Sequence, residues 1–302
     1  MQFTRRSAPL IAGLVFFAAA SVLAPGALHA QNANKQEYAP QVGQEGKDVI
    51  WVPTPQALVE RMLEMAKVTA KDYVIDLGSG DGRTVIAAAK RGVRALGIEY
   101  NPEMVELSKR NAEKESVAGR AQFIRGDIFE TDFSQATVLA LYLLPSLNLK
   151  LRPTILKMTP GTRVVSHAFS MDDWQADQTE SVEGRTAYLW IVPAPVEGTW
   201  RWKVSGSGPS DYELVLRQHF QQVEGLVKLG GKTGQLRNVK LRGDELSFTV
   251  YELTGSNPIR RDFTGRVSGN AIEGAAKYPG GEAKWTASRQ DPAAAPGAGT
   301  AR

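Results

Sequence analysis

The chain has 302 residues, of which 42% are hydrophobic and 23% charged, a composition that fits a globular protein with room for about two domains. It contains no cysteine and only three histidines, which excludes disulfides, thiolate zinc sites and cysteine nucleophiles, so we expect no metal site. The formal net charge is +4, and its distribution decides whether it indicates a nucleic-acid or membrane partner.

The chain opens with residues 1–30, which we expect to be a cleaved signal peptide. A basic start with Arg5 and Arg6 precedes an apolar run, and small residues end the segment at Ala30. This layout is typical of secretory signals, and the apolar run is short for a membrane-spanning helix. The paired arginines also match part of a twin-arginine export signal. The sequence therefore predicts an exported protein, periplasmic or secreted, with an uncleaved N-terminal membrane anchor as the alternative.

Both ends of the remaining chain lack a core-forming pattern. Residues 31–47 are polar and predict a flexible leader, and residues 290–302 are rich in Pro, Gly and Ala and predict a disordered tail. The first thirty residues hold two arginines and no acid, so their removal lowers the net charge from +4 to +2. No remaining stretch is strongly basic, and we expect no nucleic-acid partner.

Residues 48–195 alternate strand-like and helix-like segments. Thr54 is expected to cap the first helix, with Pro55 at the first helical position. The further elements expected, in chain order, are a strand at 73–76, a helix at 84–90 closed by Gly92, a strand at 95–99, a helix capped by Asn101, strands at 122–124 and 137–144, a helical stretch interrupted by Pro153, and strands at 162–169 and 187–192. Such repeated units predict an α/β domain with a Rossmann-like doubly wound sheet. Residues 169–185 show no long amphipathic helix, so the last part of the sheet is expected to be abbreviated.

Residues 196–289 follow the proline-containing boundary at 193–195 and contain strand-like segments only. Segments with alternating faces at 199–204, 211–216, 246–253 and 284–288 predict a small antiparallel β sandwich or barrel of unknown role, which could bind an envelope partner. The adjacent Arg260 and Arg261 are expected on a solvated turn. Three tryptophans fit either the domain core, which is the commoner use, or a ligand-binding face: Trp200, Trp202 and Trp285.

The residues most specific for chemistry are in the run DLGSGDG, from Asp76 to Gly82, between a strand and a helix. Glycines there allow a tight turn and let a ligand lie against exposed backbone amides. The third glycine comes one residue too early for the dinucleotide fingerprint GxGxxG. Glu99 ends the next strand, where it is placed to accept both hydroxyls of a ribose. Asp127, followed by two apolar residues, is suited to an exocyclic amine and a flat ring.

These residues resemble the cofactor site of class I S-adenosylmethionine-dependent methyltransferases, with VIDLGSGDGR as the cofactor loop, Glu99 as the ribose acid and Asp127 as the adenine acid. The resemblance implies a methyltransferase sheet and S-adenosyl-L-methionine as the cofactor. The alternatives are a glycine turn that serves only backbone geometry and a NAD-binding domain. The cofactor-binding residues that the resemblance implies are Asp76, Gly78, Ser79, Gly80, Gly82, Glu99, Tyr100, Asp127 and Ile128.

A narrower resemblance covers about residues 50 to 174. The matching runs are VPTPQALVERML, LGSGDGRTVIAAAKRG, GIEYNPEMVELSKRNA, GDIFETD, YLLPSLNLKLRP and PGTRVVSHAFSMDDW. They are similar to bacterial relatives of a protein-lysine methyltransferase family whose mitochondrial members modify the ATP synthase c-ring protein and the adenine nucleotide translocase. This implies in-line SN2 methyl transfer to a lysine, a reaction that needs mainly alignment and desolvation. The export signal and the C-terminal β domain depart from the resemblance.

On the acceptor side, Tyr142 at the carboxyl end of the fourth strand is the candidate for positioning the acceptor. The alternative is a half-buried tyrosine at a strand end. His167 ends the fifth strand and is expected to be a structural residue rather than a general base. The substrate-side candidates, several of which precede the glycine loop and could close over the cofactor, are Trp51, Pro53, Thr54, Tyr142 and Pro145.

The sequence therefore favours an exported S-adenosylmethionine-dependent methyltransferase that acts on a protein lysine. One alternative is transfer to a small molecule or lipid. Another is a non-catalytic envelope protein that keeps the fold while the β domain binds a partner. The set Asp76, Glu99 and Asp127 favours an enzyme, because a binding protein need not keep acids suited to a ribose and an adenine.

Overall fold

A computed structural model of the chain describes residues 38–203, 211–252 and 258–290. The expected signal peptide lies outside the described residues, as do residues 31–37 of the expected leader and residues 291–302 of the expected tail. Within the described ranges, no helix is both long and apolar enough to span a membrane.

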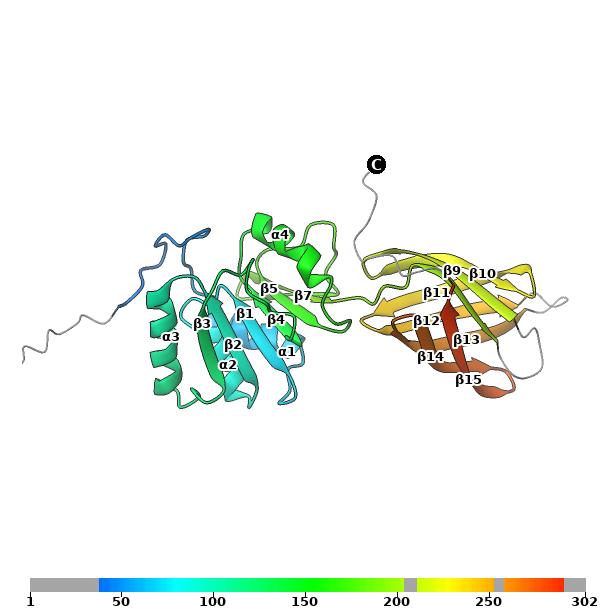
Figure 1. The fold of residues 1–302 in the computed structure, drawn as a ribbon, viewed down its shortest axis with the longest axis horizontal. Helices are drawn as coiled ribbons and strands as arrows, with labels where there is room; N and C mark the ends of the chain where they lie inside the picture. Colours follow the sequence, from blue (N-terminus) through cyan, green and yellow to red (C-terminus); the bar gives the residue numbers. More distant parts are fainter. Residues whose placement is uncertain (1–37, 204–210, 253–257, 291–302) are drawn as a thin grey trace, which may run out of the picture. The chain divides into compact units, whose positions relative to one another are not determined.

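The first part of the described chain contains a seven-stranded sheet in the order β3-β2-β1-β4-β5-β7-β6 (Figure 1). Its strands are β1 Tyr73–Leu77, β2 Arg94–Glu99, β3 Ala121–Arg125, β4 Val138–Leu141, β5 Arg163–His167, β6 Gln178–Val182 and β7 Arg185–Ile191. Strands β1 to β5 pair in parallel, whereas β7 is antiparallel to both β5 and β6. The predicted Rossmann-like sheet is confirmed, and the β6–β7 hairpin provides its last two strands without a crossover helix between them.

Helices cover both faces of the sheet. They are α1 Gln56–Met65, α2 Arg83–Lys90, α3 Pro102–Lys114 and α4 Pro145–Ile155. Side chains alternate along a strand, so Val74 and Val138 pack in one core cluster with α1, α2 and α3. Ile75 and Leu139 pack in the other cluster, which contains Leu151 of α4. Burial on both faces explains why the β4 sequence is continuously apolar rather than alternating.

The two predicted helix caps have different outcomes. The Asn101 side chain caps α3, because its oxygen accepts a hydrogen bond from the Glu103 backbone N–H at 2.8 Å. The prediction that Thr54 caps α1 is wrong, since Pro55 occupies the capping position and no side chain bonds the first turn. Thr54 lies one residue too early to reach that turn, and its hydroxyl lies instead 3.1 Å from Nδ1 of the buried His167.

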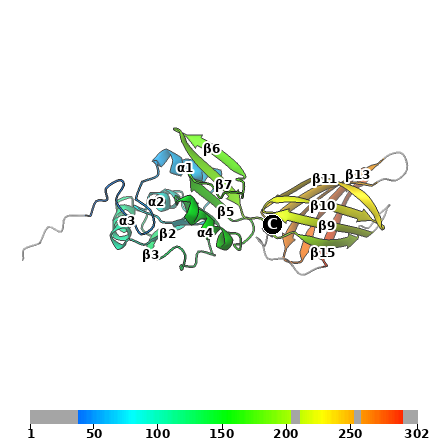
Figure 2. The same ribbon diagram turned by 90° about the horizontal axis from the view of Figure 1, so that it is seen from above.

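The second part of the described chain is a closed eight-stranded antiparallel barrel, so of the two predicted architectures the barrel is observed (Figure 2). Its strands are β8 Gly198–Lys203, β9 Asp211–His219, β10 Gln222–Leu229, β11 Lys232–Arg242, β12 Glu245–Glu252, β13 Ile259–Ser268, β14 Ala271–Tyr278 and β15 Gly281–Arg289. Trp200, Trp202 and Trp285 are at most 4% exposed and belong to the barrel core. The structure thus places these tryptophans in the core rather than on a ligand-binding face.

The adjacent Arg260 and Arg261 lie within β13, so their prediction as a solvated turn is wrong. Neighbouring residues of a strand point to opposite sides: Arg260 is exposed and pairs with Asp262, whereas Arg261 is buried and pairs with the buried Glu252. The Tyr212 hydroxyl donates a hydrogen bond to the same carboxylate at 2.5 Å. The barrel interior therefore contains a buried ionic group, the Arg261–Glu252 ion pair with the hydrogen-bonded Tyr212 hydroxyl, beside its aromatic core.

Candidate active site

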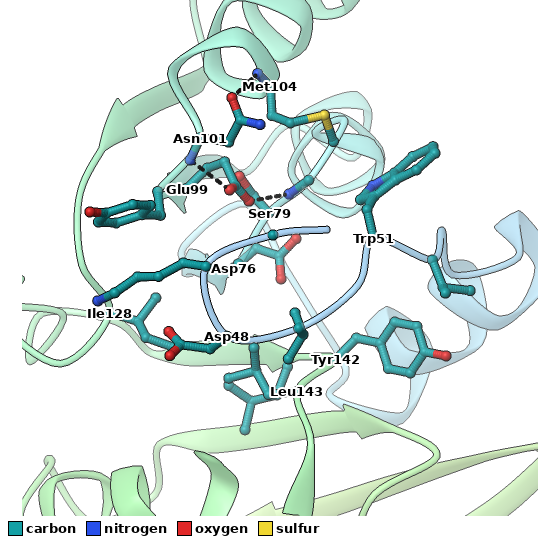
Figure 3. A pocket seen from close by; sticks show the side chains of 18 of the residues that line it. Asp48, Trp51, Asp76, Ser79, Glu99, Asn101, Met104, Ile128, Tyr142 and Leu143 are labelled. Carbon is teal, nitrogen blue, oxygen red and sulfur yellow. Dashed lines mark hydrogen bonds between the residues drawn. The ribbon is translucent and has the colours of Figure 1, made fainter. Parts of the chain in front are cut away.

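A cavity of about 580 Å³ lies at the carboxyl ends of β1, β2 and β4 (Figure 3). The strand order reverses between β1 and β4, and open α/β sheets bind ligands at such a switch point. The structure brings the predicted site residues together at this cavity, with two exceptions that do not line it, Gly82 and Pro145. Pro145 is instead the first residue of α4.

The glycine loop lines one side of the cavity. Gly78, Gly80 and Gly82 have φ angles of +77°, +55° and +83°, which other residues rarely adopt. A Cβ atom at Gly80 would lie 2.8 Å from Nε1 of Trp51, so the missing side chain lets the indole approach the loop. At Gly82 a Cβ atom would lie 2.7 Å from the Phe123 ring, so this glycine serves packing of the loop against β3.

Two carboxylates and one hydroxyl face the cavity near this loop. Glu99 accepts hydrogen bonds at 2.9 Å from the backbone N–H groups of Gly80 and Asn101, one on each oxygen, and dashed lines mark hydrogen bonds of Glu99 in Figure 3. Each oxygen keeps a further lone pair for a ligand hydroxyl. Burial raises the pKa of Asp76 to about 7, although the Thr84 hydroxyl bonds its ionised form. The buried Ser79 hydroxyl has no hydrogen-bond partner in the described part of the chain and is free for a ligand.

Asp127 lies at the far end of the same cavity, beyond β3. One of its oxygens accepts a bond from the Phe129 backbone N–H at 2.9 Å, and the other pairs with Lys47. The Lys47 ammonium holds the pKa of Asp127 below its usual range and lies 4.7 Å from the centre of the Tyr100 ring. Beside these groups, the exposed Tyr100 and the half-buried Ile128 provide apolar surface for a flat ring.

Lys47 belongs to a segment that we name the strap, residues 43–51, of which residues 44–51 line the cavity. Hydrogen bonds close it into a loop, from Gly43 N–H to Trp51 O at 2.8 Å and from Trp51 N–H to Gln44 O at 2.9 Å. Sequence reasoning missed Lys47, because its polar neighbourhood predicts a flexible leader. No local signal marks its partner, which lies 80 positions along the chain.

The acceptor-side candidates form a wall beyond the glycine loop. Tyr142 directly follows β4, and its ring stacks on the His167 ring with centroids 3.8 Å apart and on Phe169 at 6.0 Å. Burial lowers the pKa of His167 to about 4, so its imidazole is neutral at physiological pH, as suits a structural residue. Trp51, Pro53 and Thr54 also line the cavity. Sequence reasoning missed Phe169, whose only signal is its place two residues after His167 at the end of a predicted strand.

In the described ranges, no group of three or more His, Asp and Glu side chains could hold a metal ion. What the cavity offers is glycine amides, carboxylates, an unpartnered buried hydroxyl and apolar walls. These groups fit S-adenosylmethionine, which combines hydroxyls and an amine with a flat ring.

A glycine turn after the first strand, an acid on the next strand and a cavity at the switch point together define a class I S-adenosylmethionine-dependent methyltransferase. Comparisons with known proteins agree. The family model for the ANTKMT methyltransferase domain matches residues 76–178, and a DNA methylase model matches residues 32–110.

A protein-lysine N-methyltransferase of Saccharolobus islandicus is 44% identical over 151 residues, which are 48% of this chain and 94% of the relative. The adenine nucleotide translocase lysine N-methyltransferase of Mus musculus is 31% identical over 139 residues, 45% of this chain and 56% of the relative. A solved RNA methyltransferase from Salinibacter ruber, in complex with S-adenosyl-L-homocysteine, has 50% identity and a TM-score of 0.47, with 48% of this chain and 96% of that chain covered. The chain belongs to the protein-lysine N-methyltransferase family and uses S-adenosylmethionine as its cofactor.

Proposed function

We propose that this chain transfers the methyl group of S-adenosylmethionine to the side-chain amine of a lysine in a protein. The observation that carries the proposal is the cavity that joins the glycine loop, Glu99 and Asp127 to an aromatic wall at Tyr142. The similarity to the Saccharolobus islandicus protein-lysine N-methyltransferase over nearly its whole length supports lysine as the acceptor.

The cofactor assignment follows from the atoms that remain available. Glu99 would accept hydrogen bonds from the ribose hydroxyls. Asp127 would accept a hydrogen bond from the adenine amine once its carboxylate shares or releases the Lys47 ammonium. Tyr100 and Ile128 would flank the adenine ring, while the backbone of Gly78 and Gly80 would lie against the cofactor. Gly82 would support the same loop from behind, and Asp76 and Ser79 would supply polar contacts at its start.

Bound S-adenosylmethionine supplies a methyl group on a positively charged sulfur, so the protein need not form a covalent intermediate. The acceptor lysine must react as a neutral amine, and the apolar side chains of Leu143, Leu144 and Phe169 favour that form by desolvation. The lysine ammonium would first release a proton to solvent, and the free amine would then form the nitrogen–carbon bond as the carbon–sulfur bond breaks. The electron pair of that bond would stay on sulfur, so that S-adenosylhomocysteine leaves and the methylated amine carries the positive charge. Tyr142 would position the amine for this in-line attack.

The test is transfer of labelled methyl groups from S-adenosylmethionine to envelope and cytoplasmic fractions of cells that lack this protein. We expect label in protein, recovered as methyl-lysine after hydrolysis, and its loss with Glu99→Ala. Glu103→Ala, at an exposed position of the first turn of α3, serves as the control. Label only in extractable lipid or in RNA would overturn lysine as the acceptor, and cofactor binding without any transfer would indicate a non-catalytic protein.

We further propose that the chain is exported and that the barrel engages a partner in the cell envelope. The arrangement of basic, apolar and small residues in 1–30 supports export. A reporter fused after residue 40 should be active only outside the cytoplasm, and activity restricted to the cytoplasm would refute export. Crosslinking from the barrel surface in whole cells, followed by identification of the attached protein, tests the envelope partner.

A further inference from the structure

We propose that His167 and Thr54 are positioning residues that hold the Tyr142 ring as a wall of the acceptor side, a role that rests on the methyl transfer proposed above. Strand pairing brings the two rings together. Leu141 of β4 lies opposite Ser166 of β5, so the next residue of each strand, Tyr142 and His167, stands at the same edge of the sheet. Their rings stack at 3.8 Å with an interplanar angle of 29°.

The His167 ring suits this position because it is flat, buried and uncharged. It is 1% exposed, and both burial and the nearby charge of Arg185 lower its pKa. A protonated imidazole behind Tyr142 would repel the cofactor's sulfonium and an arriving lysine ammonium. A neutral ring can support the tyrosine by stacking without that cost.

Thr54 connects this stack to the cofactor loop. Its hydroxyl lies 3.1 Å from Nδ1 of His167, and its backbone carbonyl accepts a bond from Arg83 at 2.8 Å. Arg83 in turn pairs at 2.5 Å with Asp81 of the glycine loop. Polar contacts therefore run from Asp81 through Arg83 and Thr54 to His167, and the His167 ring stacks on the ring of Tyr142.

Both atoms of the Thr54–His167 contact are buried, so removing either partner leaves the other without its hydrogen bond. Without this hydrogen bond the Tyr142 ring would be held less firmly, and the acceptor amine would approach the cofactor from a wider range of directions. In-line methyl transfer depends on alignment to within about 1 Å. We therefore expect the methyl-transfer rate, rather than cofactor affinity, to depend on this contact.

The test is a double-mutant cycle with Thr54→Val, His167→Phe and the double variant, in the full chain. Single-turnover transfer from labelled S-adenosylmethionine is measured with poly-L-lysine as the probe. Each single variant should lower the rate about tenfold, and the double variant should be no slower than the slower single variant, because the two residues act as one unit. The dissociation constant of S-adenosylhomocysteine should stay within about threefold in every variant, which also reports on folding.

Two matched variants separate the hydroxyl contact from general disturbance. Thr54→Ser keeps a hydroxyl and should keep most of the transfer rate. His219→Phe makes the same substitution as His167→Phe at an exposed histidine of β9 and should leave the rate unchanged. Rates equal to the wild type in both single variants, or a double variant about a hundredfold slower through simple additivity, would overturn the positioning role.

A second measurement needs no acceptor. In protein with labelled histidine, the His167 imidazole signal should stay constant between about pH 5.5 and 8, and its assignment follows from comparison with His167→Phe. A signal that titrates near the ordinary value would contradict the buried stack. If the wild type labels neither poly-L-lysine nor cellular lysine, the proposed function fails; if it transfers normally and only the cycle fails, the positioning role alone is wrong.

Discussion

Two features of the structure require glycine at position 80. Its backbone is left-handed, and Nε1 of the Trp51 indole lies 2.8 Å from where a Cβ atom would be. Gly80→Ala should therefore lower the affinity for S-adenosylhomocysteine by at least about tenfold, because Trp51 and the glycine loop must move apart to make room for the alanine side chain. Isothermal titration calorimetry measures this directly.

The matched control is Gly92→Ala. Gly92 has a φ of +81°, but the nearest atom to an added Cβ lies 4.0 Å away, on Ala70. This control carries similar backbone strain, of about 1 kcal/mol, without touching the cavity. Equal losses of affinity in both variants would show that backbone strain, and not the contact with Trp51, explains the effect.

Asp76 should make the stability of the ligand-free protein pH-dependent. Its pKa is raised from 3.8 to about 7 by burial, so its ionised form is less stable in the folded than in the unfolded chain. The free energy of unfolding should therefore fall as the pH rises from about 4 to 7, by up to about 4 kcal/mol. Asp76→Asn should match the wild type near pH 4 and be more stable at pH 8, as measured by urea unfolding. Equal pH dependence in both proteins would contradict this.

At the residue scale, the sequence predicts those site residues whose type the ligand dictates. Asp76, Glu99 and Asp127 lie at the ends of consecutive strands, and the parallel sheet brings strand ends to one edge. The contacts of Lys47 and Thr54 could not be predicted, because each depends on how distant segments meet rather than on local pattern. Thr54 shows the difference well, since a threonine before a proline-started helix is typical of a cap, yet tertiary structure places its hydroxyl elsewhere.

The strap is an element that competes with the proposed ligand. Lys47 occupies the Asp127 oxygen that the adenine amine would need. Lys47→Met should therefore raise the affinity for S-adenosylhomocysteine by up to about fivefold, the range of a partly exposed ion pair. The gain should be largest at low salt, where the ion pair is strongest. Titration calorimetry at two salt concentrations checks both expectations.

Lys109→Met provides the control for the strap, because Lys109 pairs with Glu106 on the exposed face of α3. It should leave the affinity unchanged. A loss of affinity in Lys47→Met would mean that the strap closes over the bound cofactor and contributes to binding rather than competing with it.

The buried ionic group makes a separate prediction for the barrel. Arg261→Met leaves the Glu252 carboxylate buried without its guanidinium and should destabilise the barrel by about 3–5 kcal/mol. Arg260→Met, at the exposed neighbouring position, should change stability by no more than about 0.5 kcal/mol. Thermal unfolding of the two variants compares them, and equal effects would contradict an energetic role for the buried pair.

The alternation of buried and exposed side chains along a strand also explains which elements could be predicted from the sequence. The central sheet strands β1 and β4 are buried on both faces and stand out between helices. The edge strand β6, QTESV, is polar and largely exposed, and the sequence did not predict it. Barrel strands such as β11, KTGQLRNVKLR, likewise expose most of their side chains. Segments at β10, β11, β13 and β14 therefore lack a strong apolar pattern, and only half of the barrel strands could be placed from the sequence. The closure of the barrel depends on pairing β15 with β8, at opposite ends of this region.

For the whole molecule, the sequence predicts an α/β part followed by an all-β part, because the change from helix-like to strand-only patterns is abrupt near residue 195. The topology within each part follows different rules. Crossover helices force parallel pairing in the first part, and short turns force antiparallel neighbours in the second. The β6–β7 hairpin brings the second kind of connection into the first sheet.

These topologies also differ in contact order. Each barrel strand from β9 to β15 pairs with the strand before it, whereas the centre of the parallel sheet needs Val74 to meet Val138. Closing a short hairpin loop costs little conformational entropy, and closing a long loop costs more. In refolding, the barrel hairpins should therefore gain protection from hydrogen exchange before the parallel sheet. Since the cofactor cavity is built on β1 and β4, S-adenosylmethionine can stabilise this sheet only after the long loop between these two strands has closed.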